Sequence, residues 1–126
     1  MSQSMVVMLH FADSLRSHLD EAARSAGLTP PQAHLLIQLD APLRMSDLAE
    51  RRLCDPSTIT AMIQRLERDG FVERASDPHD GRVRHIRVTS KGRRARSIFL
   101  EIAGDGSSLV SDLTAEQRAM LAALFG

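Results

Sequence analysis

The sequence predicts a mainly α-helical protein with one small β-hairpin near residues 71–88. Apolar residues recur at steps of three and four along most of the chain, which is the period of an α-helix. Strand-like residues occur around 71–74 and 86–88, on either side of a dense turn cluster at 76–81. The length of 126 residues predicts a single domain, 1–126.

The first helix is expected from about Ser4 to Ala26, and Gly27 ends it. Its apolar positions form a heptad seam, which is typical of a helix that packs along a second helix. Burial against its own domain is the alternative. A partner chain is favoured, because a compact lobe in the middle of the sequence leaves the long terminal helices little to bury against. The seam consists of Met5, Met8, Ala12, Leu15, Leu19, Ala22 and Ala26.

Two short helices are expected next. Thr29 and Gln32 form a capping box with proline in the first turn, so a second helix begins there and ends near Pro42. Its inward residues are expected to be Ala33, Leu36 and Ile37. The third helix should run from about Ser46 to Leu53, and its inward residues are expected to be Met45, Leu48, Ala49 and Leu53.

The fourth helix has two contrasting faces. Asp55 is a natural N-cap, Pro56 suits the first helical position, and Gly70 can end the helix. The apolar face consists of Ile59, Met62, Ile63 and Leu66. The opposite face, which has no carboxylate, consists of Ser57, Thr60, Ala61, Gln64, Arg65 and Arg68. Such a face suits a groove lined with phosphates and base edges. The third and fourth helices have helix-turn-helix spacing.

A basic run begins in the hairpin and continues beyond it. Its members are Arg82, Arg84, Arg87, Lys91, Arg93, Arg94 and Arg96, with no acid among them. A solvated charged edge is the alternative interpretation. Because the run begins on a protruding hairpin next to the fourth helix, contact with DNA phosphates or with the minor groove is favoured. His79 and His85 lie on the same hairpin and are expected to face solvent or phosphate.

The C-terminal part is expected to be helical again. Thr89 can cap a helix that continues through Ile98 and Ile102. The segment 104–108 contains two glycines and either interrupts or kinks this helix; the sequence leaves both open. A second capping box at 114–117 opens a last helix, whose apolar side consists of Met120, Leu121 and Leu124.

Charge is unevenly distributed along a chain of zero net charge. Residues 44–96 hold 13 of the 16 Lys and Arg but 8 of the 16 Asp and Glu, so a basic middle lies between acidic ends. This pattern indicates one surface that faces nucleic acid. With four Phe, no Trp and no Tyr, the chain has few of the stacking side chains that single-strand binders use. Double-stranded DNA is therefore the expected partner.

Several other classes are disfavoured. The sequence has no P-loop, nucleophile elbow or paired-cysteine motif, so we expect no enzyme, no cofactor and no metal site. It has no secretory signal and no apolar stretch of membrane-spanning length. The single Cys cannot form an internal disulfide, which agrees with a reducing cytoplasm.

Several segments resemble the MarR-type winged-helix transcriptional regulators. The resemblance is strong from about Thr29 to Gly92, and the two ends match in architecture. Arg44 departs from the family, which often has a Ser or Thr helix cap at this point. The matching motifs are Leu48-Ala49-Glu50-Arg51, Asp55-Pro56-Ser57-Thr58-Ile59-Thr60, Leu66-Glu67-Arg68-Asp69-Gly70-Phe71-Val72-Glu73-Arg74, Asp80-x-Arg82 and Ile86-x-Val88-Thr89-x-x-Gly92.

This resemblance implies a winged helix-turn-helix lobe at about 29–89, flanked by dimerisation helices at about 4–26 and 90–125. It implies a homodimeric repressor that binds a pseudo-palindromic operator and is released by a small, often aromatic effector. Asp80 would brace the hairpin, or wing, and Arg82 at its tip would reach into the minor groove.

Site residues follow from these patterns. The candidates for base and nearby phosphate contacts are Ser57, Thr58, Thr60, Gln64 and Arg65. The candidate phosphate clamps are Arg68, Arg74, Arg84 and Arg87. The candidate dimer contacts are Met5, Met8, Ala12, Leu15, Leu19, Leu121 and Leu124. The effector site is unknown, and its candidates are His10 and His34, which could meet where the first two helices pack. The alternatives are a winged-helix protein-interaction module, or a redox- or metal-sensing regulator that uses Cys54 or the histidines.

Overall fold

The computed structural model describes residues 2–52, 55–77, 79–106, 109, 111 and 113–125. Leu53 and Cys54 lie outside the described residues, as do the side chains of Leu121 and Leu124. The described elements are α1 (Gln3–Ser25), α2 (Pro30–Ile37), α3 (Met45–Arg52), α4 (Pro56–Arg68), β1 (Val72–Ser76), β2 (Arg84–Val88), α5 (Ser90–Gly104) and α7 (Ala115–Phe125). The predicted fold class, mainly α-helical with a small hairpin, is confirmed.

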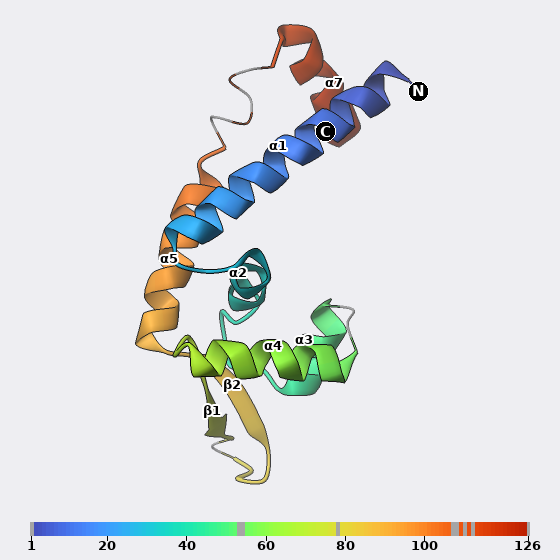
Figure 1. Cartoon of the computed structure of the whole chain (residues 1–126). Coiled ribbons are helices and arrows are strands. Elements are labelled where there is room, and N and C mark those ends of the chain that lie inside the picture. The colour runs from blue at the N-terminus through green and yellow to red at the C-terminus, as the bar shows by residue number, and fades with distance from the viewer. Residues whose placement is uncertain are drawn as a thin grey trace.

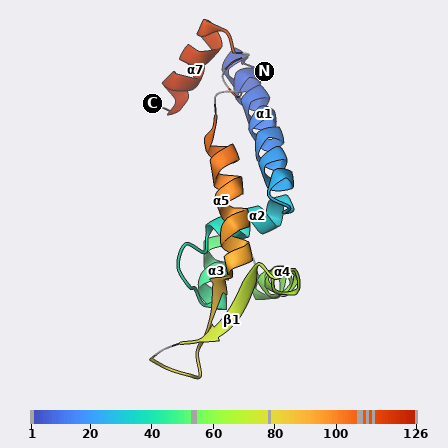
Figure 2. The same ribbon diagram turned by 90° about the vertical axis from the view of Figure 1, so that its left-hand side faces the viewer.

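The chain forms a lobe and a stem. The lobe consists of α2, α3, α4 and the hairpin, and the hairpin projects from it (Figure 1). The stem consists of α1 and α5, which pack together and lead away from the lobe (Figure 2). α7 contacts α1 near the N-terminal end of that helix. The hairpin and the stem therefore lie on opposite sides of the lobe.

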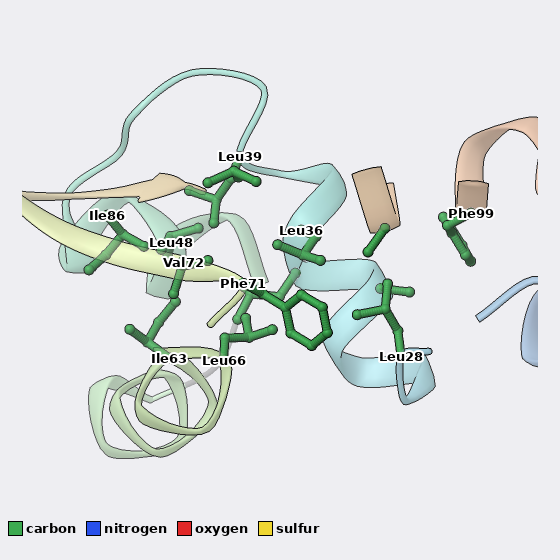
Figure 3. Close-up of a cluster of buried hydrophobic side chains, with 14 of the residues drawn as sticks. Leu28, Leu36, Leu39, Leu48, Ile63, Leu66, Phe71, Val72, Ile86 and Phe99 are labelled. Atoms are coloured by element: carbon green, nitrogen blue, oxygen red, sulfur yellow. The ribbon is translucent and has the colours of Figure 1, made fainter. Parts of the chain in front are cut away.

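The core of the lobe holds the inner face of α4. Ile59, Ile63 and Leu66 are fully buried, as the sequence predicts, and Met62 is half-buried. Figure 3 shows Ile63 and Leu66 beside residues from several other elements. The large, fully buried partners are Leu35, Leu36, Leu48 and Ile86. Because each such side chain adds about 1.5–3 kcal/mol by burial, α4 is anchored from one side and its outer face stays at the surface.

α2 begins with the predicted capping box. The Thr29 hydroxyl accepts from the Gln32 backbone N–H at 3.3 Å, and the Gln32 side chain accepts from the Thr29 N–H at 3.0 Å. Leu35 is fully buried, although the predicted inward set omitted it. α2 is covered on a wide arc, because α1, α4 and α5 all contact it. The buried Gln32 amide also donates to Asp69 at 2.9 Å, which ties α2 to the end of α4.

α3 begins at Met45, directly after Arg44. The backbone N–H of Arg44 donates to the Asp47 carboxylate at 3.2 Å. Asp47 therefore supplies the returning half of a capping box, which orders the helix start without a hydroxyl side chain at Arg44.

The hairpin is antiparallel and pairs Val72 with Val88 at its base. Leu43 adds a single bridge to Ile86, with hydrogen bonds of 3.1 and 2.7 Å between their backbones. Sequence patterns did not predict this bridge, because one bridging residue shows no strand alternation. It fixes the hairpin to the segment between α2 and α3.

α5 is capped by Thr89, as predicted, and packs closely on Phe71, just after the end of α4. The Thr89 hydroxyl accepts from the Gly92 N–H at 3.1 Å. A Cβ on the buried Gly92 would collide with the carbonyl oxygen of Phe71 and lie 2.6 Å from Val88. The helix ends at Gly104, and residues 105 and 106 are not helical, so the glycine segment interrupts the helix.

α1 matches its predicted span to within one residue, and Gly27 follows it with a φ of 75°. Ala22 and Ala23 near its end are fully buried in the lobe. Towards the N-terminus, Met5 and Leu9 are exposed, with Leu9 at 50% of its maximum. Of the other seam positions, Ala12 is exposed, and those that are half-buried are Met8, Leu15, Leu19 and Ala26. The predicted capping box at the start of α7 is also present, with Thr114 and Gln117 hydrogen-bonded to each other's backbone N–H.

Candidate nucleic-acid interface

The outward face of α4 is polar and acid-free. Its exposed residues are Ser57, Thr58, Ala61, Gln64, Arg65 and Arg68, and Thr60 is half-buried. The side chains of Gln64, Arg65 and Arg68 form no hydrogen bond or ion pair with any residue that the structure describes. Their N–H donors are therefore available to a partner outside the chain.

The first turn of α4 is ordered by its own side chains. The Asp55 carboxylate accepts from the Ser57 hydroxyl at 2.5 Å and from the Thr58 backbone N–H at 2.9 Å. These hydrogen bonds hold the pKa of the Asp55 carboxyl below its usual range, and the bond from the Ser57 hydroxyl has the largest effect. The Thr60 hydroxyl donates to the Pro56 carbonyl at 2.8 Å. Ser57 and Thr60 thus use their protons inside the helix and offer acceptor lone pairs outward, whereas Gln64 and Arg65 offer donors.

The tip of the hairpin presents two arginines. Arg82 and Arg84 are exposed, and their guanidinium groups pair with no residue in the described part of the chain. The backbone N–H of Arg82 donates to the Asp80 carboxylate at 3.1 Å, and the N–H of Val83 donates to the Asp80 carbonyl at 3.0 Å. The Asp80 side chain, which the family resemblance implies would brace the wing, thus bonds to the hairpin backbone.

Asp77 organises the rest of the turn, and sequence reasoning missed it. Its carboxylate accepts from the backbone N–H groups of His79 at 2.7 Å and Asp80 at 3.2 Å. Its second oxygen lies 3.2 Å from Nε2 of His85 in β2. The hydrogen bond from the His79 N–H is the main reason why the pKa of the Asp77 carboxyl lies below its usual range. An Asp near the start of a turn cluster that also contains Gly81 is the signal that could have identified it.

Two predicted phosphate clamps are already paired. Nε of Arg74 lies 3.2 Å from Glu67, and Nε of Arg87 lies 2.7 Å from Glu73, its cross-strand neighbour. Both pairs are substantially exposed, so each contributes little to stability and can exchange partners at small cost. Their acids nevertheless reduce the net positive charge along this side of the hairpin.

Part of the basic run has a structural role. Lys91 donates to the Asp69 carbonyl at 2.6 Å, Arg93 to the Val88 carbonyl at 3.3 Å, and Arg96 to the Leu36 carbonyl at 3.2 Å. The Asp69 and Leu36 carbonyls lie at the C-terminal ends of α4 and α2, where cations are favoured by the helix dipole. These side chains attach α5 to the lobe. Arg94 is exposed.

The histidines are distributed differently from the prediction. His10 lines a cavity of about 330 Å³ with Leu109 and Gln117 of the C-terminal segment, and His34 is half-buried in α2. The lobe contacts α1 around Ala22, about 18 Å along the helix from His10, so the expected meeting of His10 and His34 is wrong. His85 is not free in solvent but pairs with Asp77, while His79 is exposed.

Among the described residues, no group of three or more His, Cys, Asp or Glu could hold a metal ion. No helix in the same residues is long and apolar enough to cross a membrane. The suggested redox role of Cys54 lies outside the described residues.

The chain is similar to known proteins along most of its length. The sequence model of a family described as the MarR family matches residues 28–83. The HTH-type transcriptional repressor MdtR of Bacillus subtilis is 29% identical over 94 residues, which cover 73% of this chain and 61% of the relative. The chain spans between 56% and 66% of the length of the first three curated relatives that it matches.

Solved structures share the fold. A MepR-like protein complexed with pseudoligands is 31% identical, with a TM-score of 0.63 over 96% of this chain and 87% of its own. A mutant MarR from E. coli complexed with operator DNA is 24% identical, with a TM-score of 0.73 over 94% of this chain and 87% of its own. The second similarity concerns the fold alone.

Proposed function

This chain belongs to the MarR family, and we propose that it is a homodimeric transcriptional regulator that binds double-stranded DNA. The outer face of α4 would lie in the major groove, and the hairpin would follow the backbone to the adjacent minor groove. The observation that carries this proposal is the acid-free outer face of α4, whose donors have no partner among the described residues.

The side chains divide into two kinds of contact. Gln64 and Arg65, with free donors in the middle of α4, would read base edges, and the hydroxyl oxygens of Ser57 and Thr60 would accept from base amino groups. Arg68 would neutralise phosphates together with the hairpin arginines, and Arg82 at the tip would enter the minor groove. Asp80 would hold the tip backbone for this approach.

The stem would form the dimer. Met5, Val6 and Leu9 expose apolar surface at the N-terminal end of α1, and Ile98 and Leu100 expose more on α5. A second copy of the chain would cover this surface, because the lobe contacts only the C-terminal end of α1 and leaves these apolar side chains exposed. Two lobes would then reach successive major grooves, about one helical turn apart.

The family relationship supports repression that is relieved by a small effector, with no cofactor and with the cytoplasm as the site of action. An effector that changes the separation of the two lobes would change affinity for the operator by population shift. Such an effector would have to bind more tightly to the dimer with one lobe separation than to the dimer with the other.

Selection of bound duplexes from a random pool, followed by fluorescence anisotropy at one salt concentration, tests this proposal. We expect a pseudo-palindromic site, bound at least about 10³-fold more tightly than random DNA by a dimer seen in light scattering. Equal affinity for all duplexes, or no affinity, would leave a protein-interaction module as the better reading of the fold.

A further inference from the structure

A chain of contacts leads from β2 to the tip of the hairpin. His85 pairs with one oxygen of Asp77, and the other oxygen of Asp77 accepts from the Asp80 N–H. The Asp80 carboxylate in turn accepts from the Arg82 N–H. The Asp77 N–H also donates to the Val83 carbonyl at 2.8 Å, which closes the turn. The backbone of Arg82 is thus connected to His85 through Asp80 and Asp77.

The pair between Asp77 and His85 is better shielded than the other hairpin ion pairs. Its side chains are 13% and 22% exposed, against 49% and 55% for Glu73 and Arg87. A shielded pair is screened less by water and salt than an exposed one, so the charge on its histidine has a larger effect.

We propose that Asp77 and His85 form a proton-sensitive clamp that positions Arg82, so that DNA affinity rises as His85 takes up a proton. This inference rests on the proposed function and adds a regulation to it. Asp77 and His85 are positioning residues, since they act on DNA through the tip backbone.

Histidine is the side chain that ordinarily changes charge between about pH 5 and 8. A neutral imidazole can still donate one hydrogen bond from Nε2 to Asp77, and a protonated one adds the attraction of opposite charges. Asp77 stays ionised over this range, because the N–H groups of His79 and Asp80 stabilise its carboxylate. The switch is therefore the imidazole, and the carboxylate is its fixed partner.

The other charges around His85 do not replace this partner. Glu73 and Arg87, which lie one pair further along the same face, pair with each other. Arg84 precedes His85 and is exposed, and Arg44 follows the residue that bridges to Ile86. Both arginines carry the same sign as a protonated imidazole, so Asp77 and Asp80 are the described acids of the turn that can stabilise it.

Bound DNA would strengthen the effect. Phosphates near the hairpin favour the protonated imidazole, so by linkage DNA binding and proton uptake favour each other. His79 is also on the hairpin and is exposed, and its charge acts on the Asp77 carboxylate less strongly than that of His85. It provides a matched control for the general attraction between DNA and a hairpin histidine.

The first experiment needs no DNA and therefore tests the clamp separately from the proposed function. NMR of the intact protein would follow the His85 ring and the amides of His79, Asp80 and Arg82 between pH 5.5 and 8, a range chosen around the ordinary titration of histidine. We expect the three amides to shift with the same midpoint as the His85 ring and to become insensitive in His85→Gln. Amides that still shift in His85→Gln, or that ignore the His85 titration, would overturn the clamp.

The second experiment measures affinity for the selected operator at pH 6 and pH 8, at one salt concentration. Wild type should bind about three- to tenfold more tightly at pH 6, because proton uptake and DNA binding favour each other. His85→Gln keeps a neutral donor and Asp77→Asn keeps the side-chain shape, but each removes one charge of the pair. Both variants should therefore lose most of the affinity difference between pH 6 and pH 8, whereas His79→Gln should keep most of it. An unchanged ratio in His85→Gln, even with weaker binding at both pH values, would refute the inference.

Discussion

Replacing Gly92 by Ala should destabilise the protein more than any ordinary surface substitution. The new methyl group would collide with the Phe71 carbonyl oxygen and lie 2.6 Å from Val88, whereas ordinary contact begins at 3.4 Å. Phe71 cannot retreat freely, because its carbonyl accepts from the Thr89 N–H at 3.0 Å. Relief requires a shift of the backbone, which disturbs the start of α5 and the base of the hairpin together.

Overpacking of this kind costs about 1–3 kcal/mol, and a lost or weakened hydrogen bond adds about 1 kcal/mol. Alanine gives back up to about 1 kcal/mol through its helix propensity. The net loss should be about 1–3 kcal/mol, or roughly a 3–12 °C fall in Tm for a chain of this size. Gly104→Ala is the matched control, because it lies in the same helix and its Cβ would meet open space.

Differential scanning calorimetry at fixed protein concentration would measure both variants, since the Tm of a dimer depends on concentration. Gly104→Ala should stay within about 0.5 kcal/mol of wild type or gain slightly. If Gly92→Ala has the same Tm as Gly104→Ala, the close packing of α5 on Phe71 does not stabilise the base of the hairpin.

Four further outcomes follow from the same geometry. Leu9→Glu should give monomers in light scattering without lowering the helix content, because Leu9 is half exposed in one chain; a stable dimer would remove α1 from the interface. Gln64→Ala should lose about 1–3 kcal/mol on the selected site and little on random DNA, whereas Arg68→Ala should weaken both and flatten the salt dependence. Equal losses on both kinds of DNA for Gln64→Ala would remove its base-reading role. Arg82→Ala should reduce affinity with no fall in Tm, and an unchanged footprint would show that the tip does not touch DNA. Asp55→Ala should remove an N-cap worth about 1 kcal/mol near neutral pH. Because the Asp55 pKa is lowered in the folded chain, this difference should shrink as pH falls through the acid range; a pH-independent difference would contradict the capping role.

Much of the fold was predictable because its signals are local. The caps at Thr29, Asp55 and Thr89 each lie within three residues of the N–H group they satisfy, so the sequence alone locates the helix starts. The inner face of α4 follows from helical periodicity in the same way. Leu43 and its bridge to Ile86 were not predictable, because the partner lies more than forty residues away and a single pair leaves no pattern.

The hairpin turn shows a different limit. Asp80 was identified through a family resemblance, and its hydrogen bond to the Arg82 N–H is local. The role of Asp77 depends on His85, which comes close because the strands pair in a register that places Ala75 opposite His85. Composition and spacing do not fix that register. Asp77 was therefore recognisable from the sequence as a turn-forming residue, but its ion pair with His85 was not predictable.

The basic run is where sequence and structure differ most in what they imply for function. The sequence contains seven cations from residue 82 to residue 96, and from the sequence alone the whole run was expected to contact DNA. In the described structure, three of them donate to backbone carbonyls and Arg87 pairs with Glu73. Within the described residues, Arg82, Arg84 and Arg94 have no such partner. The slope of log affinity against log salt is about −0.9 for each phosphate neutralised. The slope should therefore indicate that the run neutralises nearer to three phosphates per subunit than to seven. A cation that donates to a backbone carbonyl keeps its charge, but its donors are already fixed on the lobe. All seven cations therefore attract DNA at long range, although fewer of them can bind a phosphate directly.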